Sequence, residues 1–144
     1  MSECAFCEIV ASRLPSHRVL EDEHTVAFLD IRPAAAGHTL VVPRIHARDI
    51  WEISEVCHGQ VAAMAHRVAA LLGSTLAPDG VNVTHSTGRA AGQDVFHFHV
   101  HVIPRRHGDS VRLTWNAQRA TTGELEEVLG RIRTETRTAC TDIH

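Results

Sequence analysis

The chain contains no lysine and no tyrosine, and all fourteen of its basic residues are arginine. We attribute this bias to genomic base composition rather than to function. The net charge of −3, with histidine counted as neutral, argues against a surface that coats nucleic acid. No apolar run approaches the roughly 20 residues of a transmembrane helix, and the first residues lack the features of a signal peptide. A cytoplasmic protein without nucleic-acid or membrane partners is therefore expected.

What is present is the composition of an ordinary globular domain. The chain has 144 residues, of which 44% are apolar and 22% charged, so it can bury one sizeable core. It shows no internal repeat, low-complexity tract or linker. We expect a single domain over residues 1–144, with a flexible tail from about residue 136. In a cytoplasmic protein the four cysteines are expected to be thiols or metal ligands rather than disulfides.

Two of the cysteines form a CxxC pair near the N-terminus, Cys4 and Cys7. A redox pair usually follows a strand and opens the helix of a βαβ unit, and no strand can precede residue 4. Two thiolates leave a tetrahedral zinc site two ligands short. Because histidine is abundant, a metal is the preferred interpretation, provided that the fold brings two histidines close. A redox pair and a pair without function stay open as alternatives.

Hydrophobic periodicity predicts three helices and five strands. The helices are expected at residues 8–14, at 49–73 and from 121 onward, and the strands at 18–20, 25–29, 38–43, 81–85 and within 93–104. Thr121 and Glu124 have capping-box spacing at the start of the last helix. Alternation on the last two strands favours an antiparallel sheet with one face open to a ligand. The alanine-rich stretch of the long helix permits close approach of another element, either a second subunit or the core.

The chain is organised around a stretch in which His97, His99 and His101 alternate with apolar or aromatic residues. Such alternation is typical of a strand with one packed face, so the imidazoles are expected together on the other face, ~7 Å apart. The outer two would then be ~13 Å apart, too far for all three to bind one ion through Zn–N bonds of ~2.0–2.1 Å. The preceding Gly88–Gly92 loop has two glycines, where a backbone can approach a phosphate closely. A histidine-rich exposed strand without function is the alternative.

Phosphoryl chemistry suits such a strand. Neutral imidazole is a good nucleophile toward phosphorus near pH 7, because its ordinary pKa is about 6.5. His99, in the middle, is the expected nucleophile, and His101 is expected to donate a hydrogen bond to a phosphoryl oxygen. Backbone amides around Gly92 can donate further hydrogen bonds. Positioning and charge stabilisation supply most of the catalysis in phosphoryl transfer, so these parts suffice without a catalytic metal.

These residues resemble the signature of the histidine triad (HIT) superfamily. The similarity extends over about residues 4–115, and its most specific part is the triad in Gln93–Pro104 with the Gly-Gln pair that precedes it. It also covers Phe28–Pro33, His38–Pro43 with His46, and Gly88–Gln93. The chain is similar to bacterial members of the Hint-like and Fhit-like branches. The resemblance implies an α+β fold, in which a five-stranded antiparallel sheet carries one long helix and a C-terminal helix. It also implies a homodimer formed through the long helix and a strand edge.

The resemblance further implies a hydrolase or transferase that acts at the α-phosphate of purine nucleotide conjugates, through a nucleotidyl intermediate on His99. The candidate conjugates are phosphoramidates, dinucleoside polyphosphates and adenylates. Asp30 matches the residue that binds the ribose hydroxyls. The positions that line the base pocket are apolar and suit a flat heterocycle, although core packing would explain them as well; they are Phe6, Ile9, Phe28, Leu29 and Ile31. The remaining substrate-binding positions are Ser86, Gly92, Gln93, Asp94 and Val95.

Some members of the superfamily also carry a structural zinc. The matching ligands in this chain are Cys4, Cys7, His46 and His97. Two thiolates and two imidazoles form a closed tetrahedral set, so this zinc would be structural rather than hydrolytic.

Two positions depart from the family pattern. Ser86 stands where Asn or Gln usually contacts the phosphate or sugar, so that contact is expected to be lost or water-mediated. Asp94 stands where many members have Ser or Thr near the leaving group. Its carboxylate could repel a phosphate or accept a proton-bearing amine; we favour the second interpretation, which favours phosphoramidate substrates.

Two other functions stay open. A non-catalytic nucleotide-binding or sensing dimer would use the same residues without turnover. A zinc-dependent hydrolase would need an open three-ligand set beside a general-base carboxylate, as in HExxH, and the sequence lacks such a motif.

Overall fold

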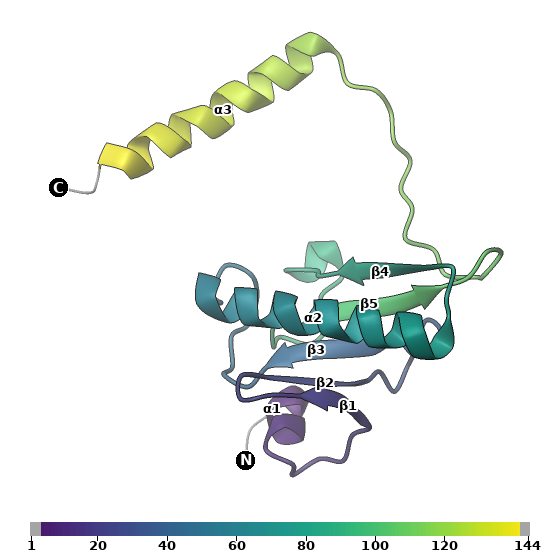
Figure 1. Ribbon diagram of the computed structural model, residues 1–144. Coiled ribbons are helices and arrows are strands. Elements are labelled where there is room, and N and C mark those ends of the chain that lie inside the picture. Colours follow the sequence, from purple (N-terminus) through teal and green to yellow (C-terminus); the bar gives the residue numbers. More distant parts are fainter. Residues whose placement is uncertain (1–3, 142–144) are drawn as a thin grey trace. The chain divides into compact units, whose positions relative to one another are not determined.

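A computed structural model describes residues 4–141 of the chain as two units, one ending at Val111 and the other beginning at Arg112 (Figure 1). The first unit contains a sheet, two helices and a short 3-10 turn. Its elements in chain order are α1 (Ala5–Val10), β1 (Arg18–Glu21), β2 (Thr25–Leu29), β3 (Thr39–Pro43), α2 (Glu55–Leu76), β4 (Gly80–Thr84), the turn η1 (Arg89–Ala91) and β5 (Val100–Arg105).

The five strands form one antiparallel sheet in the order β1-β2-β3-β5-β4. β3 lies at its centre and every residue of β3 is buried, because a central strand is covered on both faces. The predicted α+β fold with a five-stranded antiparallel sheet is confirmed.

Period-two alternation divides the strand residues between two hydrophobic clusters on opposite faces of the sheet. In β2, Ala27 packs with residues of α2, whereas Phe28 packs with Phe6 and Ile9 of α1. Figure 1 shows α2 lying across the sheet. His101 of β5 pairs with Leu40 of β3, which belongs to the α1 cluster. The face that α1 covers is therefore the one that receives the histidine side chain of β5.

The long helix α2 begins later than the sequence predicts. Ser54 caps its first turn, whereas residues before it form a turn around Asp49. The buried Asp49 carboxylate accepts the backbone N–H groups of Trp51 and Glu52, both at 3.1 Å. A side chain that captures these amides competes with helix formation, which explains the late start. The apolar stripe of α2 faces the core through five buried residues, Val61, Met64, Ala65, Val68 and Leu72.

The histidine strand is also shorter than predicted. β5 starts at Val100, and residues 95–97 bend. Just before the strand, the Phe98 N–H donates to the Ala47 carbonyl at 2.6 Å, in the loop that follows β3. The backbone of this segment thus finds partners outside the ladder, and His97 and His99 precede β5 rather than lie within it.

The second unit contains α3 (Thr122–Thr141) after an irregular segment. The predicted capping box is confirmed. The Thr121 N–H donates to Glu124 Oε2 at 2.8 Å, and the Glu124 N–H donates to Thr121 Oγ1 at 3.2 Å. The backbone is helical through Thr141, so the flexible tail stays a prediction; its last residues, 142–144, lie outside the described range. Within residues 4–141, no helix combines the length and hydrophobicity that a membrane crossing requires.

Candidate active site and metal site

A cluster of two thiols and two imidazoles joins α1 to the end of β3 and to the segment before β5. Cys4 Sγ and Cys7 Sγ each lie 3.5 Å from His97 Nδ1. His46 Nδ1 lies 3.3 Å from Cys7 Sγ and 3.1 Å from His97 Nδ1. All four ligand atoms lie within 4.8 Å of one another.

These separations fit one tetrahedral zinc. With Zn–S bonds of about 2.3 Å and Zn–N bonds of about 2.0–2.1 Å, neighbouring ligand atoms are expected ~3.3–3.6 Å apart. The four measured separations run from 3.1 to 3.5 Å. The residues present could therefore hold such an ion, and the donor set is the one that resemblance alone implied.

The backbone determines which nitrogen of His97 faces the cluster. His97 Nε2 lies 2.9 Å from the Pro43 carbonyl oxygen. A carbonyl can only accept, so Nε2 carries the proton and Nδ1 presents its lone pair to the thiols and to His46. Burial lowers the pKa of His97 to about 4, which keeps the ring in the neutral form that a metal requires.

His99 is held the opposite way round. Its Nδ1 donates to the His97 carbonyl oxygen at 2.7 Å, so its Nε2 is the unprotonated nitrogen. The ring is only 5% exposed, but it lines a cavity. Burial lowers the pKa of His99 below its usual value, so the ring is neutral at pH 7. The edge of His99 also packs on Phe6, with ring centroids 5.2 Å apart.

A fourth histidine, which the sequence analysis did not single out, sets the tautomer of His101. The Ala34 N–H donates to His38 Nδ1 at 2.9 Å, so the proton of the neutral His38 ring is on Nε2. His38 Nε2 lies 2.9 Å from His101 Nδ1 and donates to it. The proton of neutral His101 is therefore on Nε2, where it can be donated to a ligand.

Both rings of this pair favour the neutral state. Burial, together with the neighbouring rings of His99 and His38, lowers the pKa of His101 to about 4. Burial also lowers the pKa of His38, against the attraction of Asp30, whose Oδ2 lies 3.6 Å from His38 Nε2. The sequence feature that could have indicated a role for His38 is its position just before a buried strand. Only the register, in which Leu40 faces His101, shows that it reaches the triad.

The cavity beside these rings has a volume of about 440 Å³, within the range of small-molecule sites. One wall is apolar and the other carries the carboxylates and imidazoles. It brings together most of the predicted catalytic and substrate residues: Phe6, Ile9, Phe28, Leu29, Asp30, Ile31, Asp94, Val95, His99 and His101. Three predicted substrate residues are not among those that line it: Ser86, Gly92 and Gln93.

The Gln93 side chain instead forms hydrogen bonds with the backbone. Its Oε1 accepts the Gly88 N–H at 2.8 Å, and its Nε2 donates to the Arg48 and Val95 carbonyl oxygens at 2.8 and 3.1 Å. A buried amide must satisfy its donors and acceptors, and these contacts do so while bracing the glycine loop. Gly92 adopts φ +95°, a conformation that favours glycine.

Another histidine without a predicted role, His85, contacts the backbone of His99. Its Nδ1 donates to the His99 carbonyl oxygen at 2.8 Å, and its ring packs on Phe98 with centroids 4.3 Å apart. His85 therefore holds the backbone that carries His99.

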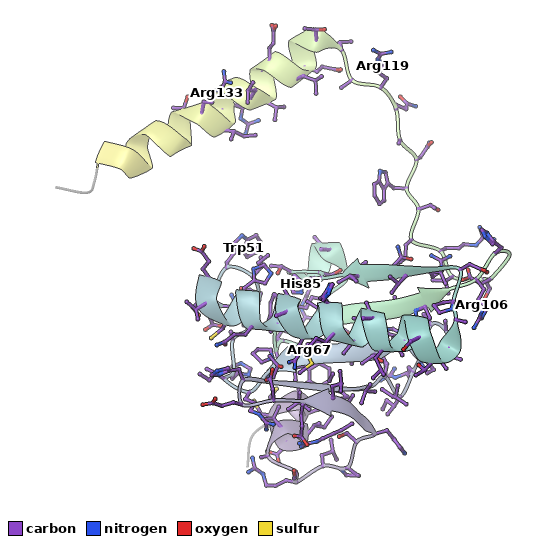
Figure 2. All side chains as sticks on the ribbon, viewed as in Figure 1. Trp51, Arg67, His85, Arg106, Arg119 and Arg133 are labelled. Atoms are coloured by element: carbon purple, nitrogen blue, oxygen red, sulfur yellow. The ribbon has the colours of Figure 1, made fainter. Side chains whose placement is uncertain are left out.

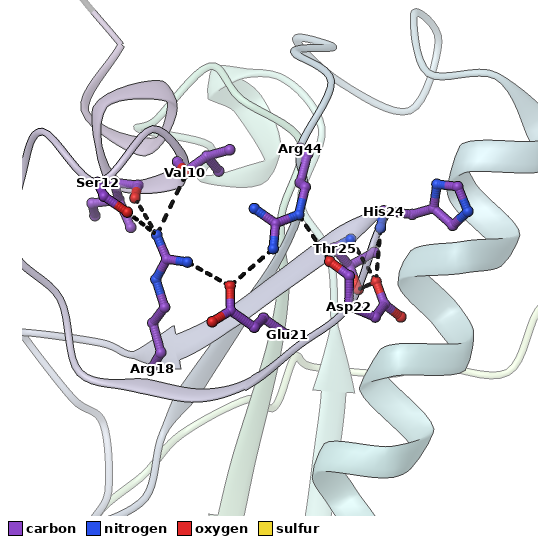
Figure 3. A network of polar contacts seen from close by, with 9 residues as sticks. Val10, Ser12, Arg18, Glu21, Asp22, His24, Thr25 and Arg44 are labelled. Atoms are coloured by element: carbon purple, nitrogen blue, oxygen red, sulfur yellow. Dashed lines mark hydrogen bonds and ion pairs between the residues drawn. The ribbon is translucent and has the colours of Figure 1, made fainter.

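The wall that α1 contributes is fixed by an arginine clamp on β1 (Figure 3). The Arg18 guanidinium donates to the Ile9 carbonyl at 2.8 Å and to Ser12 Oγ at 3.0 Å. Its other nitrogen donates to Glu21 at 2.5 Å, and Arg44 donates to the same carboxylate oxygen at 2.9 Å. These contacts tie the end of α1, and with it Phe6 and both cysteines, to the sheet.

Comparison with known proteins identifies the family to which the chain belongs. Residues 11–108 match the family described as the HIT domain. The chain therefore belongs to the HIT family, as its histidine triad predicted.

Relatives of known sequence agree with this assignment. Protein hit of Bacillus subtilis is 40% identical over 113 residues, which cover 78% of each chain. The adenosine 5'-monophosphoramidase HNT1 of Saccharomyces cerevisiae is 35% identical over 116 residues, which cover 80% of this chain and 71% of the yeast protein.

Solved structures agree as well. The crystal structure of a HIT family protein from Bacillus anthracis matches with a TM-score of 0.87 at 33% identity, covering 93% of this chain and 97% of that one. A zinc-bound histidine triad family protein from Mycobacterium smegmatis matches with a TM-score of 0.74 at 37% identity, covering 92% and 97% of the two chains.

Proposed function

We propose that the protein is a nucleotide hydrolase or transferase that acts at the α-phosphate of purine nucleotide conjugates, with His99 as nucleophile. The observation that carries the proposal is the pair of fixed tautomers at the cavity. His99 offers a lone pair on Nε2, and His101 offers a proton on Nε2, because their Nδ1 atoms are held by the His97 carbonyl and by His38. A nucleophile beside a hydrogen-bond donor is the pairing that attack on a phosphoryl group needs.

In the first step, His99 Nε2 forms a bond to the α-phosphorus, and the bond from phosphorus to the leaving group breaks. The leaving group departs with the electron pair of that bond and is protonated from solvent. The ring becomes a cationic nucleotidyl-imidazole, and its Nδ1–H donates to the His97 carbonyl, which stabilises the positive charge. His101 Nε2–H donates to a phosphoryl oxygen, where negative charge develops. In the second step, the oxygen of water or of another acceptor forms a bond to phosphorus and releases a proton to solvent. The bond from phosphorus to His99 Nε2 breaks and its electron pair returns to the ring, which leaves His99 neutral.

The apolar wall is the proposed site of the base. Phe6, Ile9 and Phe28 form a surface against which a purine ring would pack. Asp30 lies on the cavity wall and would accept hydrogen bonds from the ribose hydroxyls. The activity named for the yeast relative, adenosine 5'-monophosphoramidase, supports a purine nucleotide joined to an amine.

Two residues of this chain bear on the leaving group and the phosphate. Asp94 lines the cavity, and its charge acts on both His99 and His101. We propose that it favours amine leaving groups, which carry a proton that a carboxylate can accept as a hydrogen bond. Ser86 contributes at most a water-mediated contact to phosphate. The Gly92 N–H, which the sequence suggested as a phosphate donor, instead donates to the Arg89 carbonyl oxygen at 3.0 Å, so we assign it no direct contact with phosphate.

The cysteine–histidine cluster is the proposed site of a structural zinc, held by Cys4, Cys7, His46 and His97. The zinc named for the M. smegmatis relative supports this choice of metal. A closed four-ligand zinc supplies rigidity rather than hydrolytic chemistry. His97 itself would link the two sites, since its ring faces the cluster and its carbonyl holds His99.

We also propose a cytoplasmic homodimer formed through α2 and the sheet edge at β4. Val81 and Val83 of β4 are 43% and 51% exposed. The groove beside this strand is lined by Ala62, Ala65 and Ala69 of α2, which permit close approach.

The test is to trap the intermediate. The purified protein is incubated with adenosine 5'-phosphoramidate carrying a radiolabelled phosphate, and quenched in alkali, in which phosphohistidine bonds survive. A labelled protein adduct that disappears in His99→Ala, while the variant still binds adenosine monophosphate, is the expected result. Binding with neither adduct nor turnover in the wild-type protein would instead make it a non-catalytic nucleotide-binding dimer.

A further inference from the structure

Helix α3 exposes an apolar stripe. Leu125, Val128, Leu129 and Ile132 are 60%, 53%, 42% and 58% exposed, and their spacing places them on one face of the helix. Within the described part of the second unit, residues 112–141, α3 is the only helix or strand. In proteins most of the stability of a helix comes from packing of its apolar face rather than from helix propensity, and Gly130 in the interior of α3 lowers its stability by ~1 kcal/mol relative to alanine. Such a helix needs a surface that covers its stripe.

The sequence of α3 has a two-fold pattern about the point between Val128 and Leu129. The outer apolar residues, Leu125 and Ile132, lie at equal distances from this point. Four of the five charged residues between positions 124 and 133 obey the same symmetry with their signs exchanged, because Glu124 mirrors Arg133 and Glu126 mirrors Arg131. The fifth, Glu127, mirrors Gly130 and lies on the face of the helix opposite the stripe. Arg133 is labelled on the helix in Figure 2. A self-complementary surface of this kind is what an interface between two identical chains requires.

Helix geometry decides the direction of the pairing. At about 100° per residue, Glu126 and Arg133 flank the stripe on one side, and Glu124 and Arg131 flank it on the other. When two copies pair antiparallel about the symmetry point, the positions of Glu126 and of Arg133 of the second copy differ by about 3 Å along the helix axis. Glu124 lies equally near Arg131 of the second copy. A parallel pair would instead bring Glu124 beside Glu126 of the second copy.

We propose that α3 binds α3 of a second copy of this chain as an antiparallel helix pair, with the four apolar residues inside and four ion pairs along its flanks. The capping box does not prevent this pairing, because both of its contacts to the Glu124 side chain use Oε2. The proposal rests on α3 alone, and it holds whether or not His99 is a nucleophile.

Disulfide trapping tests the pairing and its direction. The background carries Cys57→Ser and Cys140→Ser with zinc supplied, and either Val128→Cys or Leu125→Cys is added. In an antiparallel pair the two 128 positions meet at the symmetry point, whereas the two 125 positions lie about 10 Å apart along the axis. The expected result is rapid covalent dimer formation by Val128→Cys, and formation slower by at least tenfold by Leu125→Cys.

Two outcomes would overturn the proposal. Equal trapping of both variants would mean a parallel pair, and trapping of neither above the background protein would mean that α3 covers another surface. Circular dichroism of each variant confirms that the fold is intact.

Charge exchange gives a second, independent test. The Val128→Cys protein is prepared with Glu124→Arg and Glu126→Arg, or with Arg131→Glu and Arg133→Glu. Each variant alone places like charges together and is expected to trap on the order of tenfold more slowly. A mixture of the two restores all four ion pairs, so trapping returns as a mixed dimer that mass spectrometry identifies. Unchanged trapping of the Arg131→Glu, Arg133→Glu variant, which keeps the capping box, would contradict the proposal.

Discussion

The part of the chain that the structure describes contains two clusters that each combine histidines with thiols or a carboxylate, and we propose different functions for them. The first contains His46 and His97 with two thiols, and the second contains His38 and His101 with a carboxylate; in each, the ligand atoms lie within 4.8 Å of one another. The Phe6 ring contacts His97 and His99, at 6.0 and 5.2 Å between centroids. Residue type and spacing therefore do not distinguish a metal site from a phosphate site here.

The difference lies in which ring nitrogen the backbone holds. The Pro43 carbonyl takes the Nε2 proton of His97 and leaves Nδ1 for the cluster. The His97 carbonyl takes the Nδ1 proton of His99 and leaves Nε2 for the cavity. Two histidines only two residues apart are thereby given opposite tautomers, and with them opposite tasks.

The largest effects are expected from two substitutions, His97→Ala and His99→Ala, which distinguish the proposed metal ligand from the proposed nucleophile. His97→Ala removes one of the four proposed zinc ligands and leaves the others without a closed set. We expect loss of bound zinc and a drop of at least ~3 kcal/mol in the free energy of unfolding. His99→Ala leaves the ligand set complete, so zinc content should be unchanged while turnover falls by at least ~10³-fold. Metal analysis, urea unfolding and turnover on the same two proteins check this. A common loss of all three properties in both variants would contradict the separation.

The next effect concerns the tautomer of His101. His38→Phe removes the donor to His101 Nδ1, so the ring is free to carry its proton on the wrong nitrogen. We expect kcat to fall roughly 10–100-fold with little change in KM and none in zinc content. His38→Gln retains an N–H donor near the position of Nε2 and should recover part of the loss. Equal kcat values for the Phe and Gln variants would show that His38 acts only by filling space.

The sequence alone predicted the two clusters to different extents. The proposed zinc ligands Cys4, Cys7, His46 and His97 and the α+β fold were reached by resemblance to a known family, whereas periodicity gave the approximate positions of the strands and favoured an antiparallel sheet. His38 was missed, because its role depends on the register of β3 against β5, and register is not encoded in a single strand.

The histidine strand was predicted to include His97 and His99, whereas β5 begins at Val100, for a related reason. Alternation of apolar and polar side chains reports which face a residue occupies, and it does not report where backbone pairing begins. The contact of Phe98 with Ala47, in a loop distant in sequence, ends the ladder at Val100. Gln93 was assigned to substrate for its place in a motif, whereas its amide satisfies the surrounding loop.

A smaller effect should appear in the pH dependence of stability. His101 has a pKa of about 4 and His38 a lowered pKa in the folded protein, whereas unfolded histidines titrate near 6.5. Between these values the unfolded chain binds protons that the folded chain does not. The neutral His38–His101 pair therefore makes its full contribution to the free energy of unfolding above pH 6.5, and this contribution is lost as the pH falls toward 4. Urea unfolding at pH 7.5 and 5 should show a shallower pH dependence in His38→Phe than in the wild type; an identical slope would contradict a neutral pair.

The smallest effect tests what the two clusters share, namely the helix that supplies the thiols to one and the apolar wall to the other. Arg18→Ala removes the donor to the Ile9 carbonyl and to Ser12, which fixes the end of α1. We expect a Kd for adenosine monophosphate that rises about 3–10-fold and a loss of ~1–2 kcal/mol in stability. Arg13→Ala is the matched control, because its ion pair with Glu8 on the same helix has an arginine side chain that is 59% exposed, and exposed pairs contribute little. Isothermal titration of both variants decides the matter: equal Kd values would mean that α1 holds its position without the clamp, through the cluster at its other end.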